Sequence, residues 1–236
     1  MLLDAARRAA ERGAGEGAPL AGLMVALAAD LPGRAGIAVN AEAAGAVVVD
    51  TASGEPAKRL LLAGAVSAAF VRTFAETGET AALRTTSGPV LLARTVPDLS
   101  VFLSLVEGDR VRPTSGPWEI GAHSDSIADT ELRDAVADVA ALLSLHGKKI
   151  LDLDAGRPTL RDKLRGLDRR HPVWAAKSPD IVVSASGRRP QWTNPAVTMP
   201  VGTGSRGRTL AVRFTARPGL DRDVLDLARL VDADLP

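Results

Sequence analysis

Few side chains in this sequence can exchange a proton near neutral pH, because its 236 residues include three histidines and no cysteine. His123 and Asp125 are two residues apart, so both would point to the same side of an extended backbone. Such a pair can transfer protons, and His171, which precedes a proline, can do the same. We take His123, Asp125 and His171 as candidates for general acid–base catalysis. The alternatives are loop hydrogen bonding for Asp125 and anchoring of a loop for His171.

Two acidic motifs bear on metal binding. The step from His123 to Asp125 resembles the first ligand strand of co-catalytic zinc aminopeptidases, which also need an adjacent Glu-Glu pair that this sequence lacks. Asp152 and Asp154 follow two apolar residues and resemble the nucleophile strand of haloacid-dehalogenase-type phosphatases, but no later acidic pair follows to hold magnesium. The lack of cysteine excludes thiolate zinc sites and iron–sulfur clusters. We predict no metal and no cofactor, and interpret the two aspartates as surface residues.

A glycine-rich stretch at residues 202–207 has the G-x-G-x-x-G spacing of dinucleotide-binding loops. In those folds a helix follows the loop, whereas here the alternating residues 209–215 indicate a strand. The stretch is then either a hairpin loop or an anion-binding loop that uses backbone amides together with Arg206 and Arg208.

Charge is distributed unevenly, although the net charge is only +1. Residues 1–147 carry a net charge of −6 and residues 148–218 a net charge of +10. The two zones either complement each other within the fold or attract an anionic ligand. Helix-turn-helix, zinc-finger and aromatic-sheet signatures are absent, so we expect no nucleic acid. The predicted ligand-binding residues lie in the basic zone: Arg188, Arg189, Trp192, Asn194, Gly204, Arg206 and Arg208.

These residues must be positioned by alternating helices and strands. In the first part we expect a buried helix over residues 19–31 and a helix over 56–77. Strands are expected at residues 35–39, 46–50, 80–84, 90–96 and 99–106, the last three as antiparallel hairpins. This order of elements resembles roadblock-like and GAF-like modules, a likeness that assigns no functional residue.

The second part carries clearer signals. A helix is expected from Asp129, its N-cap, to His146, with Gly147 as its stop. A short helix at 160–167, strands at 180–185 and 209–215, and a final helix capped by Asp221 follow. The predicted fold class is α+β (mixed α/β), an antiparallel-rich sheet flanked by helices. The chain would divide near residue 112 into modules 1–112 and 113–236, the latter containing the basic residues 148–218.

Composition narrows the class of protein without naming a function. With 46% hydrophobic and 24% charged residues the chain is globular. The apolar run at residues 20–29 is too short to cross a membrane and lacks a basic leader, so we expect a cytoplasmic protein. We predict a non-enzymatic sensory, regulatory or scaffold protein that binds a small anionic ligand or a protein partner. The alternatives are an enzyme acting on an anionic substrate, such as a phosphorylated one, and a structural homo-oligomer subunit.

Overall fold

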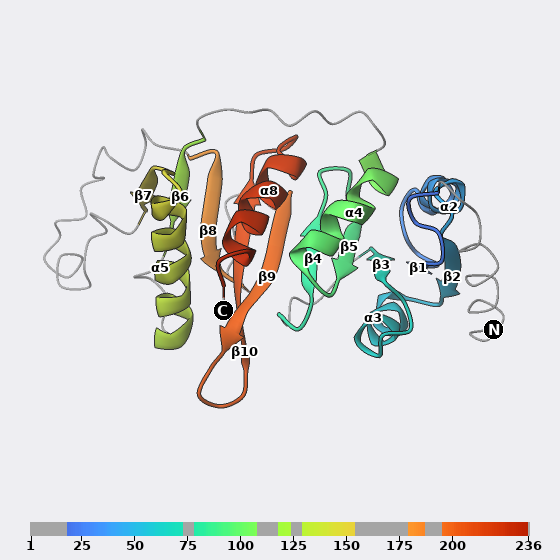
Figure 1. The fold of residues 1–236 in the computed structure, drawn as a ribbon, viewed down its shortest axis with the longest axis horizontal. Helices are drawn as coiled ribbons and strands as arrows, with labels where there is room; N and C mark the ends of the chain where they lie inside the picture. Colours follow the sequence, from blue (N-terminus) through green and yellow to red (C-terminus); the bar gives the residue numbers. More distant parts are fainter. Residues whose placement is uncertain are drawn as a thin grey trace, which may run out of the picture.

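One mixed sheet of ten strands organises the chain in a computed structural model. The structure describes residues 18–72, 78–107, 118–123, 129–153, 179–186 and 195–235. Strands follow the order β2-β1-β3-β5-β4-β9-β10-β8-β6-β7, and the sheet runs along the long axis of the molecule (Figure 1). In the first part the elements are β1 (Met24–Ala28), α2 (Arg34–Ala43), β2 (Val47–Thr51), α3 (Gly54–Leu62), β3 (Ala68–Val71), β4 (Ala81–Arg84), β5 (Val90–Ala93) and α4 (Val96–Glu107). In the second part they are β6 (Ile120–Ala122), α5 (Thr130–Leu145), β7 (Ile150–Asp152), β8 (Ile181–Ala185), β9 (Ala196–Thr203), β10 (Thr209–Ala216) and α8 (Asp221–Asp232).

The two parts of the chain repeat one topology. In the first, β1 is flanked by β2 and β3 as parallel neighbours, and β3, β5 and β4 continue antiparallel. In the second, β6 is flanked by β7 and β8 as parallel neighbours, and β8, β10 and β9 continue antiparallel. The antiparallel pair β4–β9 joins them. A pseudo-two-fold axis therefore passes between β4 and β9, perpendicular to the sheet.

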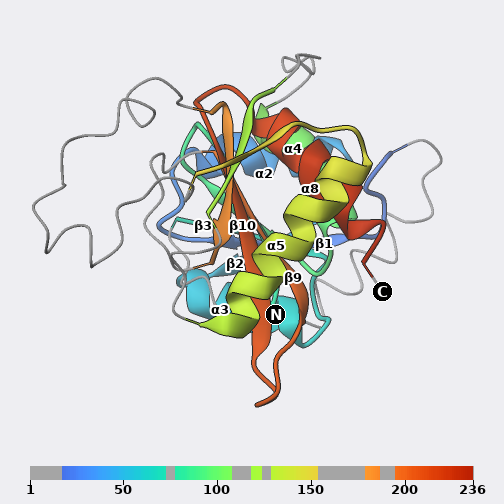
Figure 2. The ribbon, with the colours of Figure 1, turned by 90° about the vertical axis from the view of Figure 1, so that its left-hand side faces the viewer.

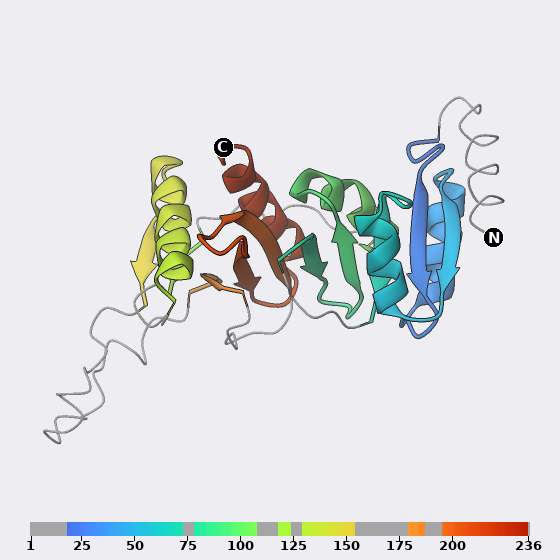
Figure 3. The same cartoon turned by 90° about the horizontal axis from the view of Figure 1, so that it is seen from below.

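Helices cover the two faces unequally. α2, α4, α5 and α8 pack on one face around a large core that includes Leu27, Phe70 and Phe214. Figures 2 and 3 show α5 and α8 on this side of the sheet, with α4 following along it. On the opposite face α3 buries Ala57 and Leu61 against the strands of the first part, in a second and smaller core.

The mixed α/β class is as predicted, but the sheet is mixed where an antiparallel-rich one was expected. Four of the strand pairs are parallel, all of them around β1 and β6. Whether the chain divides into two domains near residue 112 stays a prediction. One continuous sheet spans both predicted modules.

Several first-part elements were assigned wrongly. The apolar run at 20–29 holds strand β1, which is buried on both faces because Val25 and Leu27 lie in the larger core and Ala26 and Ala28 in the smaller one. Residues 35–39 belong to helix α2, and residues 99–106 belong to helix α4. The predicted helix over 56–77 is a shorter helix, α3, followed by strand β3. The order of elements behind the roadblock-like and GAF-like resemblance is therefore wrong.

Other predictions are confirmed. β2, β4, β5, β8 and β10 lie where strands were expected. The Asp129 side chain caps α5 by accepting a hydrogen bond from the Leu132 N–H (3.2 Å), and Gly147 follows with a positive φ of 73°. The final helix, α8, is confirmed, but the predicted cap at Asp221 is wrong, because Leu220 is the N-cap and Asp221 is the first residue of the helix. The predicted short helix at 160–167 lies outside the described residues.

Candidate functional site

The structure places only part of the predicted site. His123, Gly204, Arg206 and Arg208 lie within the described residues. The remaining candidates lie outside them: Asp125, His171, Arg188, Arg189, Trp192 and Asn194.

The glycine-rich stretch is the hairpin loop between β9 and β10, and it contacts the start of α5. The Gly204 N–H donates to the Arg208 carbonyl (2.8 Å), and the Ser205 N–H donates to Glu131 Oε1 (2.8 Å). Arg208 forms an ion pair with Asp129. A Cβ at Gly204 would lie 2.5 Å from Glu131 Oε2, so glycine permits this approach. The anion held by the Ser205 amide is thus a carboxylate of the same chain.

Hydrogen bonding keeps both carboxylates of this contact ionised. The side-chain bond from Arg208, followed by the Leu132 backbone N–H, lowers the pKa of Asp129 below its ordinary value. The hydroxyl and then the N–H of Ser205 lower the pKa of Glu131 in the same way. Asp129 belongs to the acidic zone and Arg208 to the basic zone, so at this point the two zones are internally complementary.

His123 extends strand β6 by one residue. Its N–H donates to the Val183 carbonyl (3.0 Å), which continues the parallel ladder with β8. Ile120 lies in the large core under helix α5, so alternation places the side chain of His123 on the opposite face. Because Ala122 pairs with Val183, His123 lies beside Ser184.

A row of polar side chains crosses this face. Ser184 pairs with Arg213 of β10, and Arg213 pairs with Thr198 of β9. Together with His123 they form the polar row, four residues on adjacent strands about 5 Å apart. Ser184 and Thr198 are each 2% exposed and Arg213 is 8% exposed. Polar side chains are rarely buried in such numbers without a structural or chemical reason.

The same register continues into the first part of the chain, where the row is apolar. Thr198 pairs with Ala82, and Leu92, Ala69 and Ala26 follow across β5, β3 and β1. Each of these four is at most 4% exposed, and they belong to the smaller core beneath α3. The apolar row therefore continues the polar row across the β4–β9 pair, on the same face of the sheet but in the other repeat of the topology. The fold alone therefore does not require polar residues at these positions.

One member of the polar row lacks a hydrogen bond. Within the described part of the chain, the buried hydroxyl of Ser184 has no hydrogen-bond partner. A buried hydroxyl without a partner costs about 1–3 kcal/mol. A serine between an imidazole and a guanidinium has the groups that nucleophilic catalysis uses: a nucleophile, a base and a cation that stabilises negative charge.

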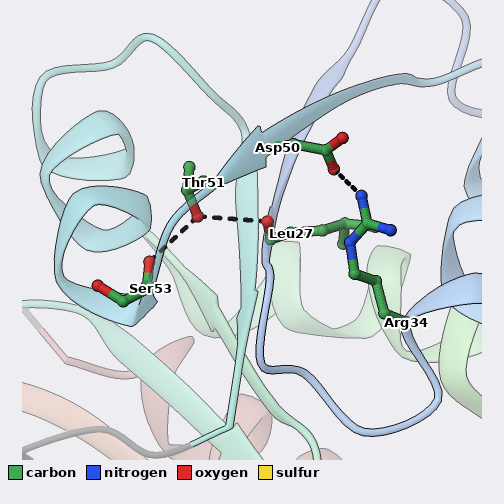
Figure 4. Close-up of polar contacts among 5 residues, drawn as sticks. All are labelled: Leu27, Arg34, Asp50, Thr51 and Ser53. Atoms are coloured by element: carbon green, nitrogen blue, oxygen red, sulfur yellow. Dashed lines mark hydrogen bonds and ion pairs between the residues drawn. The ribbon is translucent and has the colours of Figure 1, made fainter.

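The carboxyl ends of β1 and β2 form a second place where ligands commonly bind in α/β sheets. Here Thr51 Oγ1 lies 3.2 Å from the Leu27 carbonyl and 3.1 Å from the Ser53 carbonyl, and Arg34 pairs with Asp50 (Figure 4). These contacts fasten the start of α3 and of α2 to the strand ends. Because the polar groups in Figure 4 bond to one another in this way, we assign no catalytic role to this edge of the sheet.

Sequence reasoning identified His123 but did not include Arg213 among the predicted site residues. It missed Ser184 and Thr198, because a single hydroxyl in an apolar strand gives no signal without the register of its neighbours.

Among the described residues no group of three His, Asp or Glu side chains gathers as a metal site. No helix in the described ranges is long and apolar enough to cross a membrane.

No family model and no curated protein matches this sequence. Solved structures share its fold over nearly the whole chain. A 6-aminohexanoate cyclic dimer hydrolase complexed with substrate aligns with TM-score 0.65 and 16% identity, over 98% of this chain and 88% of the other. The native peptide amidase from Stenotrophomonas maltophilia aligns with TM-score 0.67 and 13% identity, over 98% and 87%. A bacterial aryl acylamidase of the amidase signature enzymes family aligns with TM-score 0.64 and 12% identity, over 98% and 87%.

At these identities the likeness establishes the fold, which is that of amidase-signature α/β enzymes. It also corrects the functional prediction. A non-enzymatic sensory, regulatory or scaffold protein was expected, and that reading is wrong on this comparison, because the solved chains that share the fold are hydrolases. The comparison favours the alternative prediction of an enzyme.

Proposed function

We propose that this protein is a hydrolase that cleaves an amide bond in a small substrate carrying an anionic group. Support for the reaction comes from the named activities of the solved chains with this fold, which include a peptide amidase and an aryl acylamidase. The observation that carries the location is the polar row, in which Ser184, Thr198 and Arg213 are buried and which continues as an apolar row in the first part of the chain.

The residues of the polar row supply distinct roles. Ser184 Oγ attacks the carbonyl carbon of the amide while His123 accepts the hydroxyl proton. The C–N bond then breaks, His123 returns the proton to the leaving amine, and an ester to Ser184 remains. Water hydrolyses this ester with His123 again accepting a proton, which releases the acid and restores the serine hydroxyl.

Arg213 lies on the other side of Ser184 from His123 and provides the positive charge. Its guanidinium can bind a carboxylate or phosphate of the substrate through paired N–H donors. Thr198, the next residue of the row, adds a hydroxyl beside Arg213. Because Ser184 is 2% exposed, the substrate must reach it through a local opening of this face.

The test is a hydrolysis assay on the full chain. N-acyl amino acids and their uncharged amide analogues are supplied, and the released amine is measured. We expect turnover of the anionic substrates, a loss of more than about 10³-fold in kcat for Ser184→Ala and a loss of about 10²- to 10⁴-fold for His123→Ala. Arg213→Lys should raise KM for the anionic substrates more than for their neutral analogues, because it loses the paired donors.

Ser144→Ala is the matched control, because Ser144 is an exposed serine on α5 whose hydroxyl donates to the Ala140 carbonyl. Its activity should equal that of the unmodified chain. Turnover that persists in Ser184→Ala, or no turnover of any amide by the unmodified chain, would remove the proposal. A cytoplasmic location and homo-oligomerisation stay predictions.

A further inference from the structure

A groove lies between α5, the β9–β10 hairpin and the end of the chain, on the helix-covered side of the sheet. Its volume is about 660 Å³. Apolar side chains from all three elements line it: Leu142 and Leu145 from α5, Val201 and Leu210 from the hairpin, and Leu235. Leu145 is 84% exposed, more than any other large hydrophobic residue within the described part of the chain. Leu145 and its apolar neighbours thus offer a partner a small exposed apolar contact.

The charged side chains that line the groove are all acidic, and two of them, Asp134 and Asp234, have the basic partners Arg133 and His146 beside the groove. Carboxylates of Glu131, Asp134, Asp138 and Asp234 line it, and no lysine or arginine is among its described lining residues. Glu131 is held ionised by Ser205, whose hydroxyl and N–H lower the pKa of that carboxyl. Asp134 and Asp138 are one helical turn apart on α5. The groove thus has apolar walls and an acidic rim.

We propose that this groove binds a basic amphipathic helix of a partner protein. The lining residues of α5 extend from Glu131 to Leu145, which at about 1.5 Å per residue corresponds to roughly 21 Å, or four turns of a docked helix. Apolar residues of the partner at positions i, i+3 or i+4, and i+7 enter between Leu142, Leu145 and Leu235. Lysines or arginines along its flank meet Asp134 and Asp138.

This surface does not depend on the proposed hydrolase site. The polar row lies on the opposite face of the sheet from α5, and it shares no residue with the groove. Binding in the groove and activity at Ser184 can therefore be measured and lost separately.

The test uses synthetic helical peptides of 18 residues as probes of the full chain. One carries leucines at helical spacing with lysines on both flanks, the second has glutamate in place of lysine, and the third has the lysine composition in scrambled order. Fluorescence anisotropy measures binding at low and at high salt. We expect binding of the lysine peptide alone, with an affinity that falls as salt rises.

Variants locate the binding. Asp138→Lys and Leu145→Ser should each weaken the lysine peptide at least tenfold, whereas Asp98→Lys on α4 should leave binding unchanged. Equal binding of the scrambled peptide, or full binding to Asp138→Lys, would overturn the proposal. Light scattering that shows a dimer for the unmodified chain and a monomer for Leu145→Ser would also overturn it, because the groove would then be covered by a second copy.

Discussion

Asp221 joins the two halves of the fold through a part-buried contact with Thr86. It lies in the first turn of α8 and is 3% exposed. Its carboxylate accepts two hydrogen bonds from Thr86, 135 residues away: the N–H at 2.6 Å and the hydroxyl at 2.5 Å. The Thr86 hydroxyl oxygen also accepts from the Gly219 N–H (3.1 Å). The turn after β4 is thereby held against the start of α8, so Asp221 should contribute strongly to stability.

The expected cost of removing Asp221 follows from these contacts. A hydrogen bond to a charged group contributes about 1.5–3 kcal/mol, and loss of the acceptor leaves the Thr86 N–H without its partner. The carboxylate also lies at the N-terminus of α8, where negative charge stabilises by about 0.3–1 kcal/mol. Allowing for partial relaxation, Asp221→Ala should lower the free energy of unfolding by about 3 kcal/mol. Asp221→Asn keeps one acceptor oxygen and should cost about half as much.

Urea unfolding measures both values, with Asp226→Ala as the matched control. Asp226 is exposed on the same helix and pairs with Arg229 at 3.6 Å, so its removal should cost no more than about 0.5 kcal/mol. In a double-mutant cycle, Thr86→Val and Asp221→Ala should show a coupling free energy of at least about 1 kcal/mol. If Asp221→Ala unfolds at the same urea concentration as Asp226→Ala, the reasoning about this contact is refuted.

Three further predictions concern other parts of the fold. Gly45→Ala should lower the free energy of unfolding by more than about 1 kcal/mol. Gly45 has a φ of 88°, and an added Cβ would lie 2.6 Å from the Cβ of Ala18. Unchanged stability in urea would contradict this prediction. Leu27→Ala should cost about 2–5 kcal/mol, because Leu27 is fully buried in β1 between two parallel strands, and a cost below 1 kcal/mol would mean that β1 is not central. Finally, the Ser205 contact lowers the pKa of Glu131 below its ordinary value of 4.5. The contact therefore stabilises the fold above pH 4.5, and this stabilisation is lost as the pH falls through the lower pKa of the folded protein. The NMR shift of the Ser205 N–H should titrate with a midpoint below 4.5, and a midpoint at or above 4.5 would contradict the contact.

Periodicity predicted the second part of the chain better than the first. α5 and α8 each present one apolar stripe, and apolar and polar residues alternate along β10. In these three elements the spacing of the apolar residues therefore matches the type of element that forms. β1 is apolar along its whole length because parallel strands and cores on both faces bury it. A run of this kind has no period that separates a buried strand from a buried helix, which is why residues 20–29 were assigned to a helix.

The candidate site needed information that the sequence does not carry. His123 was identified by its type, whereas Arg213 was not among the predicted site residues. Ser184 became a candidate only through its register with these two residues, which depends on contacts between strands far apart in the chain. The contrast with the apolar row appears only once the pseudo-two-fold relation of the two halves is known.

One variant, measured in two ways, tests whether the polar row catalyses amide hydrolysis. Ser184→Ala removes a buried hydroxyl that has no hydrogen-bond partner in the described structure. Its free energy of unfolding should therefore stay the same or rise, because the desolvation cost disappears. In the hydrolysis assay on N-acyl amino acids the same variant should lose more than about 10³-fold in kcat. Undiminished turnover in a stable Ser184→Ala protein would contradict the account.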